Sequence, residues 1–351
     1  MYGNIWWGQV GRSLRFLSRV ADALREGRST LVQLPKNLPW PNLFRDAVEL
    51  RCCGASAARR LIREGWTPGA DPGRFVLETF CDRDVVCEYW PGEPPGAYLG
   101  RREDIGLCEY DIWITGIRRK EDLMKWQRFL TDYQTHSREL PQRAVFLLEY
   151  SGPVPEGWNL PRVEYTLDSR DCRVFCLETA AALGNTSLPD YQAELAVRIG
   201  AGNPEFCAAL LRQGELLLTD PVSAAARVFL RETDSTGAPF PEIPQPQIES
   251  AALSSAIVML FPILERLRID FVTKHEAQLR RCLPIRNSNG EEITDPWDLE
   301  IGPLAHITGS AGYAFPEEDV KTIRLCRKVR NLLAHNKPLP PADAGSLLRM
   351  G

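Results

Sequence analysis

The chain has 351 residues, of which 44% are hydrophobic and 25% are charged, and its formal net charge at pH 7 is −4. This composition is typical of a globular protein with one large domain or two. The net charge excludes a positive field over the whole chain, so nucleic acid could be bound only by a local basic patch. The first residues lack the apolar core of a signal peptide, and the apolar run 254–264 is too short to span a bilayer. We therefore expect a cytoplasmic protein that does not insert into membranes.

The ten cysteines form no CxxC pair, and no Cys/His cluster has the spacing of a zinc site. Cys172 and Cys176 would share a helix face, but no third ligand is near them in sequence. Most of the cysteines lie in apolar runs, which indicates small buried thiols in a reducing compartment. We expect no metal site and no cofactor.

Predicted helices and strands alternate in the first part of the chain. Apolar residues from Val10 to Leu24 recur at helical spacing and predict a helix over 10–27, which Gly27 closes. Buried strands separated by helices favour a three-layer α/β domain with a helical appendage. Strands are predicted at 29–35, 73–81, 108–117, 143–152 and 163–168, and further helices at 40–51, 56–65, 120–140, 171–183, 191–200, 203–213 and 220–232.

The segment after the first predicted strand would hold a phosphate loop in a nucleotide-binding domain. Residues 36–44 read KNLPWPNLF and lack the glycines that let backbone N–H groups wrap a phosphate. Asp111 begins an apolar strand, as in a second nucleotide motif, and residues 195–211 look like a helical lid. The region 1–235 thus resembles a degenerate, inactive AAA/STAND-type P-loop domain. The alternative is an unrelated α/β domain in which Asp111 is a strand-edge acid.

A segment rich in Pro, Ser, Thr and acidic residues separates this region from a helical one. We predict an α/β sensing or regulatory domain over 1–235, a Pro-rich linker over 236–249 and an all-α domain over 250–351. The last domain should contain a long helix over 248–283 with a bend at Pro262, a loop and short helix over 288–308, and a final helix over 316–336.

The final helix has one apolar face and one basic face, as a rotation of about 100° per residue shows. Arg330 lies at the border between the faces, and its long stem can cross apolar surface while its guanidinium reaches the polar groove. Lys337 follows the helix end, and no acidic residue lies between Lys321 and Lys337. The apolar face carries Leu325, Cys326, Val329, Leu332 and Leu333, and the polar face carries Arg324, Arg327, Lys328, Asn331 and His335.

This set of side chains suits RNA cleavage without a metal. The reaction needs a proton acceptor for the ribose 2′-OH and a donor for the leaving 5′-oxygen, and histidine serves either role near neutral pH. An arginine can stabilise the charge on the phosphorane, and an asparagine can orient the phosphate. A two-fold dimer would bring two such sets together. The same basic residues also suit an ordinary helix end, because cations favour a helix C-terminus.

The sequence RNLLAH, Arg330 to His335, resembles the R-x4–6-H motif of HEPN domains, and the preceding long helix, loop and short helix fit that context over about 250–340. The resemblance implies a bundle of four or five helices, a homodimer and a metal-independent endoribonuclease, often from toxin or anti-phage systems. Carried over by position, Arg330 would stabilise phosphate, Asn331 would orient it and His335 would act as acid or base. Arg324, Arg327, Lys328 and Lys337 are the predicted RNA-binding residues.

Two functions from different classes therefore stand side by side. The first is an RNase effector held inactive by its first domain or by a regulatory protein partner. The second is a non-catalytic adaptor that uses both domains for protein contacts. An active NTPase is disfavoured by the missing phosphate loop. His275 and His306 are interpreted as lone helical histidines, with His306 as a core or groove residue rather than a ligand.

Overall fold

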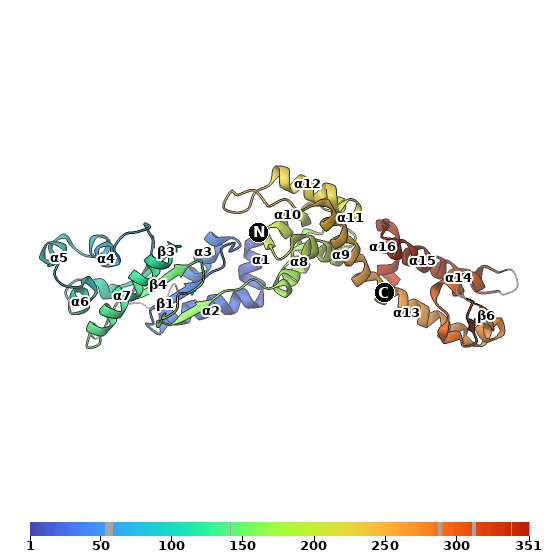
Figure 1. Cartoon of the computed structure of the whole chain (residues 1–351), viewed down its shortest axis with the longest axis horizontal. Helices are drawn as coiled ribbons and strands as arrows, with labels where there is room; N and C mark the ends of the chain where they lie inside the picture. The colour runs from blue at the N-terminus through green and yellow to red at the C-terminus, as the bar shows by residue number, and fades with distance from the viewer. Residues whose placement is uncertain (53–58, 141, 287–289, 311–313, 338, 351) are drawn as a thin grey trace. The chain divides into compact units, whose positions relative to one another are not determined.

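The computed structural model describes residues 1–351 except 53–58, 141, 287–289, 311–313, 338 and 351. The chain forms two compact units, Met1–Asp171 and Cys172–Gly351 (Figure 1). The sequence predicted domain boundaries at 235 and 249 instead, and those boundaries stay a prediction.

A five-stranded parallel sheet organises the first unit, with strand order β2-β3-β4-β1-β5. All six residues of β4 are buried, as expected of a central strand that helices cover on both faces. A parallel sheet with helices on both faces is an α/β architecture, as predicted. The strands are β1 Thr30–Gln33, β2 Arg60–Gly65, β3 Tyr110–Ile117, β4 Val145–Tyr150 and β5 Arg162–Glu164.

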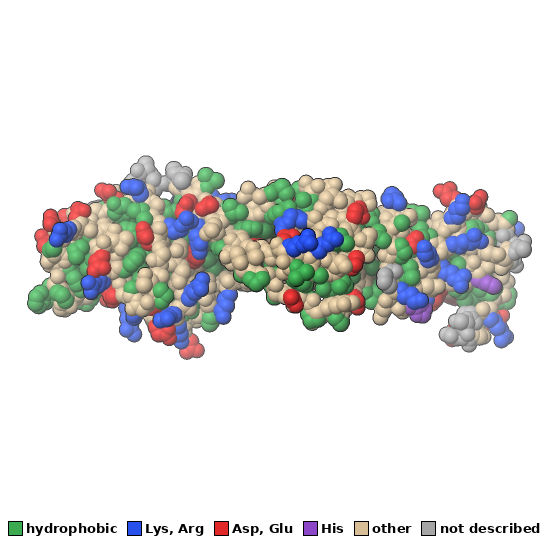
Figure 2. All heavy atoms as spheres, turned by 90° about the horizontal axis from the view of Figure 1, so that it is seen from above, with side chains coloured by type: hydrophobic (Ala, Val, Ile, Leu, Met, Phe, Trp, Pro, Cys, Tyr) green, Lys and Arg blue, Asp and Glu red, His purple; other side chains and the backbone are tan. Residues whose placement is uncertain are grey.

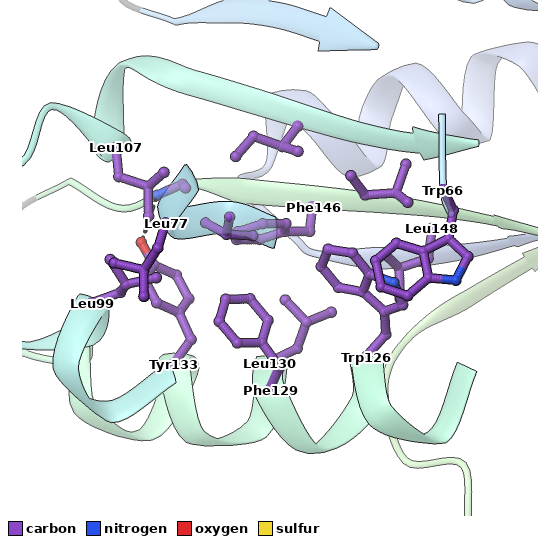
Figure 3. Packing of buried hydrophobic residues seen from close by; sticks show 14 of the residues in the cluster. Trp66, Leu77, Leu99, Leu107, Trp126, Phe129, Leu130, Tyr133, Phe146 and Leu148 are labelled. Carbon is purple, nitrogen blue, oxygen red and sulfur yellow. Dashed lines mark hydrogen bonds between the residues drawn. The ribbon is translucent and has the colours of Figure 1, made fainter. Parts of the chain in front are cut away.

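Helices cover both faces of this sheet, so the predicted three-layer arrangement is confirmed. On one face, Phe146 of β4 packs against Trp126 of α7, and Figure 3 shows the surrounding apolar cluster. On the other face, Trp113 of β3 meets Phe44 of α3 edge to face at 5.8 Å between ring centroids. The helices are α1 Tyr2–Gln9, α2 Gly11–Arg25, α3 Pro41–Cys52, α4 Pro72–Phe80, α5 Arg83–Glu88, α6 Pro95–Gly100, η1 Leu107–Glu109 and α7 Lys120–His136.

Two element predictions in the first unit were wrong. Of the run predicted as a helix over 56–65, residues 56–58 lie outside the described residues. The rest forms strand β2 from Arg60 onward, because pairing with β3 outweighs its helical propensity. The run predicted as a strand over 73–81 forms helix α4. Asp71 caps this helix by accepting a hydrogen bond from the N–H of Arg74, and Pro72 occupies its first position.

The second unit is helical. Its elements are α8 Ser169–Leu183, which crosses the boundary between the units, α9 Pro189–Gly200, α10 Pro204–Leu211, α11 Glu215–Thr219, α12 Pro221–Arg231, α13 Gln245–Cys282, the hairpin strands β6 Ile285–Arg286 and β7 Glu292–Ile293, η2 Pro296–Asp298, α14 Ile301–Gly309, α15 Glu317–Ala334 and α16 Pro341–Met350. Helix α16 was not predicted. Within the predicted linker, Pro239 pairs with Thr233, and α13 starts four residues before residue 249.

The backbone of the long helix α13 is non-helical at His275, with φ −116° and ψ 16°, and Pro262, where a bend was predicted, lies inside the helix. Its C-terminal half packs with α14 and α15 around a core that includes Leu279, Leu304 and Ile323. One 18-residue window of α13 has a mean hydropathy of 1.6 and is 28% buried, so the helix is long and apolar enough to cross a membrane. One such helix is weak evidence for a membrane span, because core helices of soluble proteins pass the same test.

Candidate functional site

Helix α15 carries the predicted site, and the structure confirms its two faces. Ile323, Cys326, Val329 and Leu333 are buried, while Asn331 is exposed. Burial raises the pKa of Cys326 to about 11, so its thiol is a neutral part of the core and not a nucleophile.

A groove runs between α15 and the preceding helix α14. Its volume is about 580 Å³. Arg324, Arg327, Lys328 and Asn331 follow one another at i, i+3, i+4 and i+7, so they form a single stripe of α15. The opposite wall consists of Ala305, His306 and Gly309 of α14 and of Ser310, which follows that helix. Figure 2 shows Lys and Arg side chains gathered with histidine over the end of the chain that carries these helices.

The structure therefore brings together three of the four predicted RNA-binding residues and the predicted orienting amide. Lys337 lies beyond the helix end and does not line this groove. The groove also includes His306, which sequence reasoning did not select as a site residue. The sequence indicates this role of His306 only weakly. The spacing of His306, Gly309 and Ser310 places them on one helix face, but the helix that packs opposite this face depends on the tertiary structure.

Arg330 faces a different cavity from Asn331. It lines a space of about 310 Å³ together with Phe261, Arg268 and Trp297. Its Nη2 lies 3.8 Å from Oε2 of Glu300. The expectation that its guanidinium reaches the polar groove is wrong for the single chain, because Arg330 follows the side of α15 that faces α13 and η2.

His335 caps the C-terminus of α15. Asn336 adopts the left-handed conformation at φ 51°, its N–H donates to the carbonyl of Leu333, and the N–H of Lys337 donates to the carbonyl of Leu332. This hydrogen-bond pair is the Schellman arrangement that commonly ends helices, and asparagine tolerates its left-handed position. The backbone of His335 is thus held at the helix end, with an exposed side chain that does not line the groove.

One of the basic side chains that line the groove forms an ion pair. The Nζ of Lys328 lies 2.7 Å from Oδ2 of Asp343 in α16. Within the described residues, Arg324 and Arg327 have no such ion pair, so the groove keeps a net positive charge. No group of three or more His, Cys, Asp or Glu side chains that could hold a metal ion occurs in the described part of the chain.

His275, which also belongs to the second unit, has a structural role. His275 is 8% exposed, its Nε2 lies 2.9 Å from Oδ2 of Asp319, and its ring packs against both Phe271 and Phe315. Lys274 donates to the same carboxylate at 2.8 Å. This cluster ties the interrupted turn of α13 to the first turn of α15 and contributes nothing to the groove.

In the first unit, a cavity of about 370 Å³ lies at the carboxyl ends of β1, β4 and β5, and Lys36 lines it. Asp111 lies at the opposite, amino-terminal end of β3. That end is about 20 Å from the carboxyl end of the strand, at roughly 3.3 Å per residue. There its Oδ1 pairs with Nε of Arg59 at 2.9 Å, and burial raises the pKa of Asp111. Asp111 is therefore a strand-edge acid, as the alternative interpretation held, and it does not reach that cavity.

No family model matches the chain, and no curated protein matches it. Among solved structures, a variant of Thermotoga maritima RuvB is similar at 11% identity over 80% of this chain and 79% of that one, with a TM-score of 0.31. The Aeropyrum pernix ORC1 protein in complex with DNA is similar at 14% identity over 95% and 91%, with a TM-score of 0.36. TM-scores this low do not establish a shared fold, so function is inferred from the residues of the site itself.

Proposed function

We propose that the α14–α15 groove binds the RNA backbone and that two copies of the chain act together as a metal-independent endoribonuclease. The observation that carries this proposal is the convergence of Arg324, Arg327 and Lys328 with Asn331 on one groove. Cations neutralise phosphates, and the amide can fix the orientation of one phosphate.

A second copy is part of the proposal because Arg330 and His335 do not line the groove within one chain. Across a two-fold axis, each copy would place its helix end over the RNA held by its partner. Arg330 would then stabilise charge on the phosphorane, and His335 would give or take the proton. The first unit would regulate this effector, by itself or through a partner protein, as in toxin or anti-phage systems.

The test uses the full chain and labelled single-stranded RNA in EDTA, with binding and cleavage measured separately. The double variant R324A/R327A should lose RNA affinity, because both side chains line the groove. Lys321→Ala is the matched control, since Lys321 is an exposed cation of the same helix that pairs with Glu317 outside the groove.

Arg330→Ala and His335→Ala should bind RNA as the unchanged protein does but cleave it at least 100-fold more slowly. A well-folded dimer that neither binds nor cleaves RNA would overturn the proposal. Equal loss of RNA binding in Lys321→Ala and in R324A/R327A would mean that RNA binding depends on the overall positive charge of the helix and not on the groove.

The second candidate is the non-catalytic adaptor, and the exposed apolar face of α13 favours it. Ile257, Val258, Phe261 and Ile269 are each 39–54% exposed along this helix, which is an unusual run of large apolar side chains for a surface. Adaptor function predicts a complex with a defined partner that persists in R324A/R327A and is lost in Phe261→Asp. RNA binding that depends on the groove would instead favour the ribonuclease.

A further inference from the structure

We propose that His306 is a second catalytic imidazole of this ribonuclease and accepts the proton of the ribose 2′-OH in the α14–α15 groove. This inference rests on the proposed function. Metal-free cleavage needs a proton acceptor and a proton donor at the same phosphate, and the RNLLAH motif supplies one histidine. The groove supplies another.

The position of His306 follows from the packing of α14. Leu304, Ala305, Ile307 and Thr308 are buried, which turns His306 outward. Its side chain is exposed and lines the same groove as Arg327 and Asn331. Within the described residues, its ring has no ion pair or side-chain hydrogen bond, so the imidazole can meet a ligand.

The groove beside His306 is open at Gly309. A Cβ added to Gly309 would meet no atom of the described residues within 4 Å. Ser310, which follows, donates its hydroxyl to the backbone carbonyl of His306 at 2.9 Å, and this bond helps to hold the last turn of α14. A sugar-phosphate unit could therefore enter between the imidazole and the basic stripe of α15.

The groups that face His306 suit an acceptor near a phosphate. Arg324, Arg327 and Lys328 come from α15, and Asp343 of α16 pairs with Lys328. Cations of the stripe would hold the phosphodiester, so that the adjacent 2′-OH lies beside the ring. His275 cannot serve in its place, because it is buried and hydrogen-bonded to Asp319.

The proposed step balances without a metal or an external reagent. His306 takes the proton of the 2′-OH as the 2′-oxygen forms a bond to the adjacent phosphorus. The bond between phosphorus and the 5′-oxygen breaks, and protonated His335 gives its proton to that oxygen. The products are a 2′,3′-cyclic phosphate and a 5′-hydroxyl, and solvent returns both histidines to their starting states.

The first experiment measures RNA affinity, the cleavage rate and the pH dependence of cleavage for His306→Ala. We expect affinity to change by less than about twofold and cleavage to fall about 100- to 10,000-fold. The pH profile of the unchanged protein should be bell-shaped, and the residual activity of His306→Ala should lose the limb that reports the base. His136→Ala is the histidine control, because His136 is an exposed residue of the first unit whose Nδ1 lies 2.8 Å from the backbone carbonyl of Asp132.

The second experiment fills the groove without touching its charges. Gly309→Leu should weaken RNA binding at least tenfold, because its side chain would occupy the open space. Gly302→Leu is the matched control, since Gly302 is also a glycine of α14 and does not line the groove. No atom of the described residues lies within 4 Å of a Cβ added there.

The outcomes separate the two proposals. If the unchanged protein neither binds nor cleaves RNA, the proposed function fails. If it cleaves RNA and His306→Ala cleaves at the same rate with the same pH profile, the function stands and the role of His306 is overturned. If His306→Ala loses affinity and cleavage in equal proportion, His306 is a binding residue and not the base.

Discussion

The ammonium of Lys328 lies 2.7 Å from the carboxylate of Asp343, so α16 contributes an acid to the edge of a basic groove. This acid offsets one of the charges that would meet a phosphate. Asp343→Asn should therefore raise the affinity for single-stranded RNA and steepen its salt dependence by about 0.7 in a plot of log affinity against log salt. Fluorescence anisotropy titrations at several salt concentrations measure both quantities.

The control for this prediction removes the same charge elsewhere. Glu317→Gln also deletes one acid of the second unit, but its partner Lys321 lies outside the groove. Equal effects of the two substitutions would mean that net charge alone matters and that Lys328 has no local contact with RNA.

Asp319 makes the second unit sensitive to acid. Burial by itself would raise its pKa, but hydrogen bonds from Lys274 and His275 outweigh burial and lower the pKa. A carboxyl group whose pKa is lower in the folded state stabilises the fold above its unfolded pKa of about 3.9, and this stabilisation is lost as pH falls through the folded value. Protection of the backbone amides in the first turns of α15, relative to their intrinsic exchange rates at the same pH, should therefore fall below about pH 4.

Asp319→Asn should remove that acid dependence and should already speed exchange at pH 7, because the amide forms no ion pair. The comparison variant is Asp270→Asn, which changes an exposed acid of α13. Identical acid profiles for the unchanged protein and Asp319→Asn would show that the cluster with His275 does not stabilise this helix junction.

Gly96 lets α6 approach the backbone of α7. An added Cβ would lie 2.5 Å from the carbonyl oxygen of Phe129 and 3.0 Å from the amide nitrogen of Tyr133, so one helix would have to shift. Gly96→Ala should lower the free energy of unfolding of the first unit by about 1–3 kcal/mol. Thermal unfolding followed by near-UV circular dichroism measures the effect on the surrounding aromatic cluster.

Gly8→Ala should have the opposite effect on stability. Gly8 is exposed in α1, and a Cβ added there would meet no atom within 4 Å in the part of the chain that the structure describes. Alanine should stabilise this helix by up to about 1 kcal/mol, because it is the better helix former. If both substitutions stabilise the protein, the close approach of α6 to α7 is not a constraint.

The fold could be predicted where burial is periodic. Helices α2 and α15 have one apolar face each, and strand β4 is apolar except for Glu149, so their local patterns decide their structure. The prediction failed at α4 and β2, where local pattern and tertiary context disagree. Helix α4 depends on its Asp-Pro start, and β2 is an edge strand whose residues are mostly half-buried or exposed.

The candidate site was predicted in part for a similar reason. Helical geometry alone placed Arg324, Arg327 and Asn331 on one stripe, because it needs only the rotation per residue. It could not tell which cavity Arg330 would enter or that α14 would bring His306 to the stripe. Both depend on how three helices pack, and sequence spacing does not encode that.

Arg45 and Glu149 provide a test of the first unit's architecture. Nε and Nη2 of Arg45 in α3 donate to the two carboxylate oxygens of Glu149, at 3.0 and 2.6 Å, and Glu149 is only 5% exposed at the end of β4. Arg45→Ala would leave a buried carboxylate without its partner and should cost about 3–5 kcal/mol. Chemical denaturation monitored by tryptophan fluorescence measures the loss.

Two further variants test whether the loss of stability in Arg45→Ala comes from leaving Glu149 without its partner. Arg74→Ala removes an exposed arginine from its pair with Glu78 and should leave the unfolding midpoint unchanged. The double variant R45M/E149L replaces the buried pair with apolar side chains and should recover most of the stability lost in Arg45→Ala, because no charge then remains buried. If the double variant is as unstable as the single one, the arginine stabilises α3 through packing of its stem and not by neutralising Glu149.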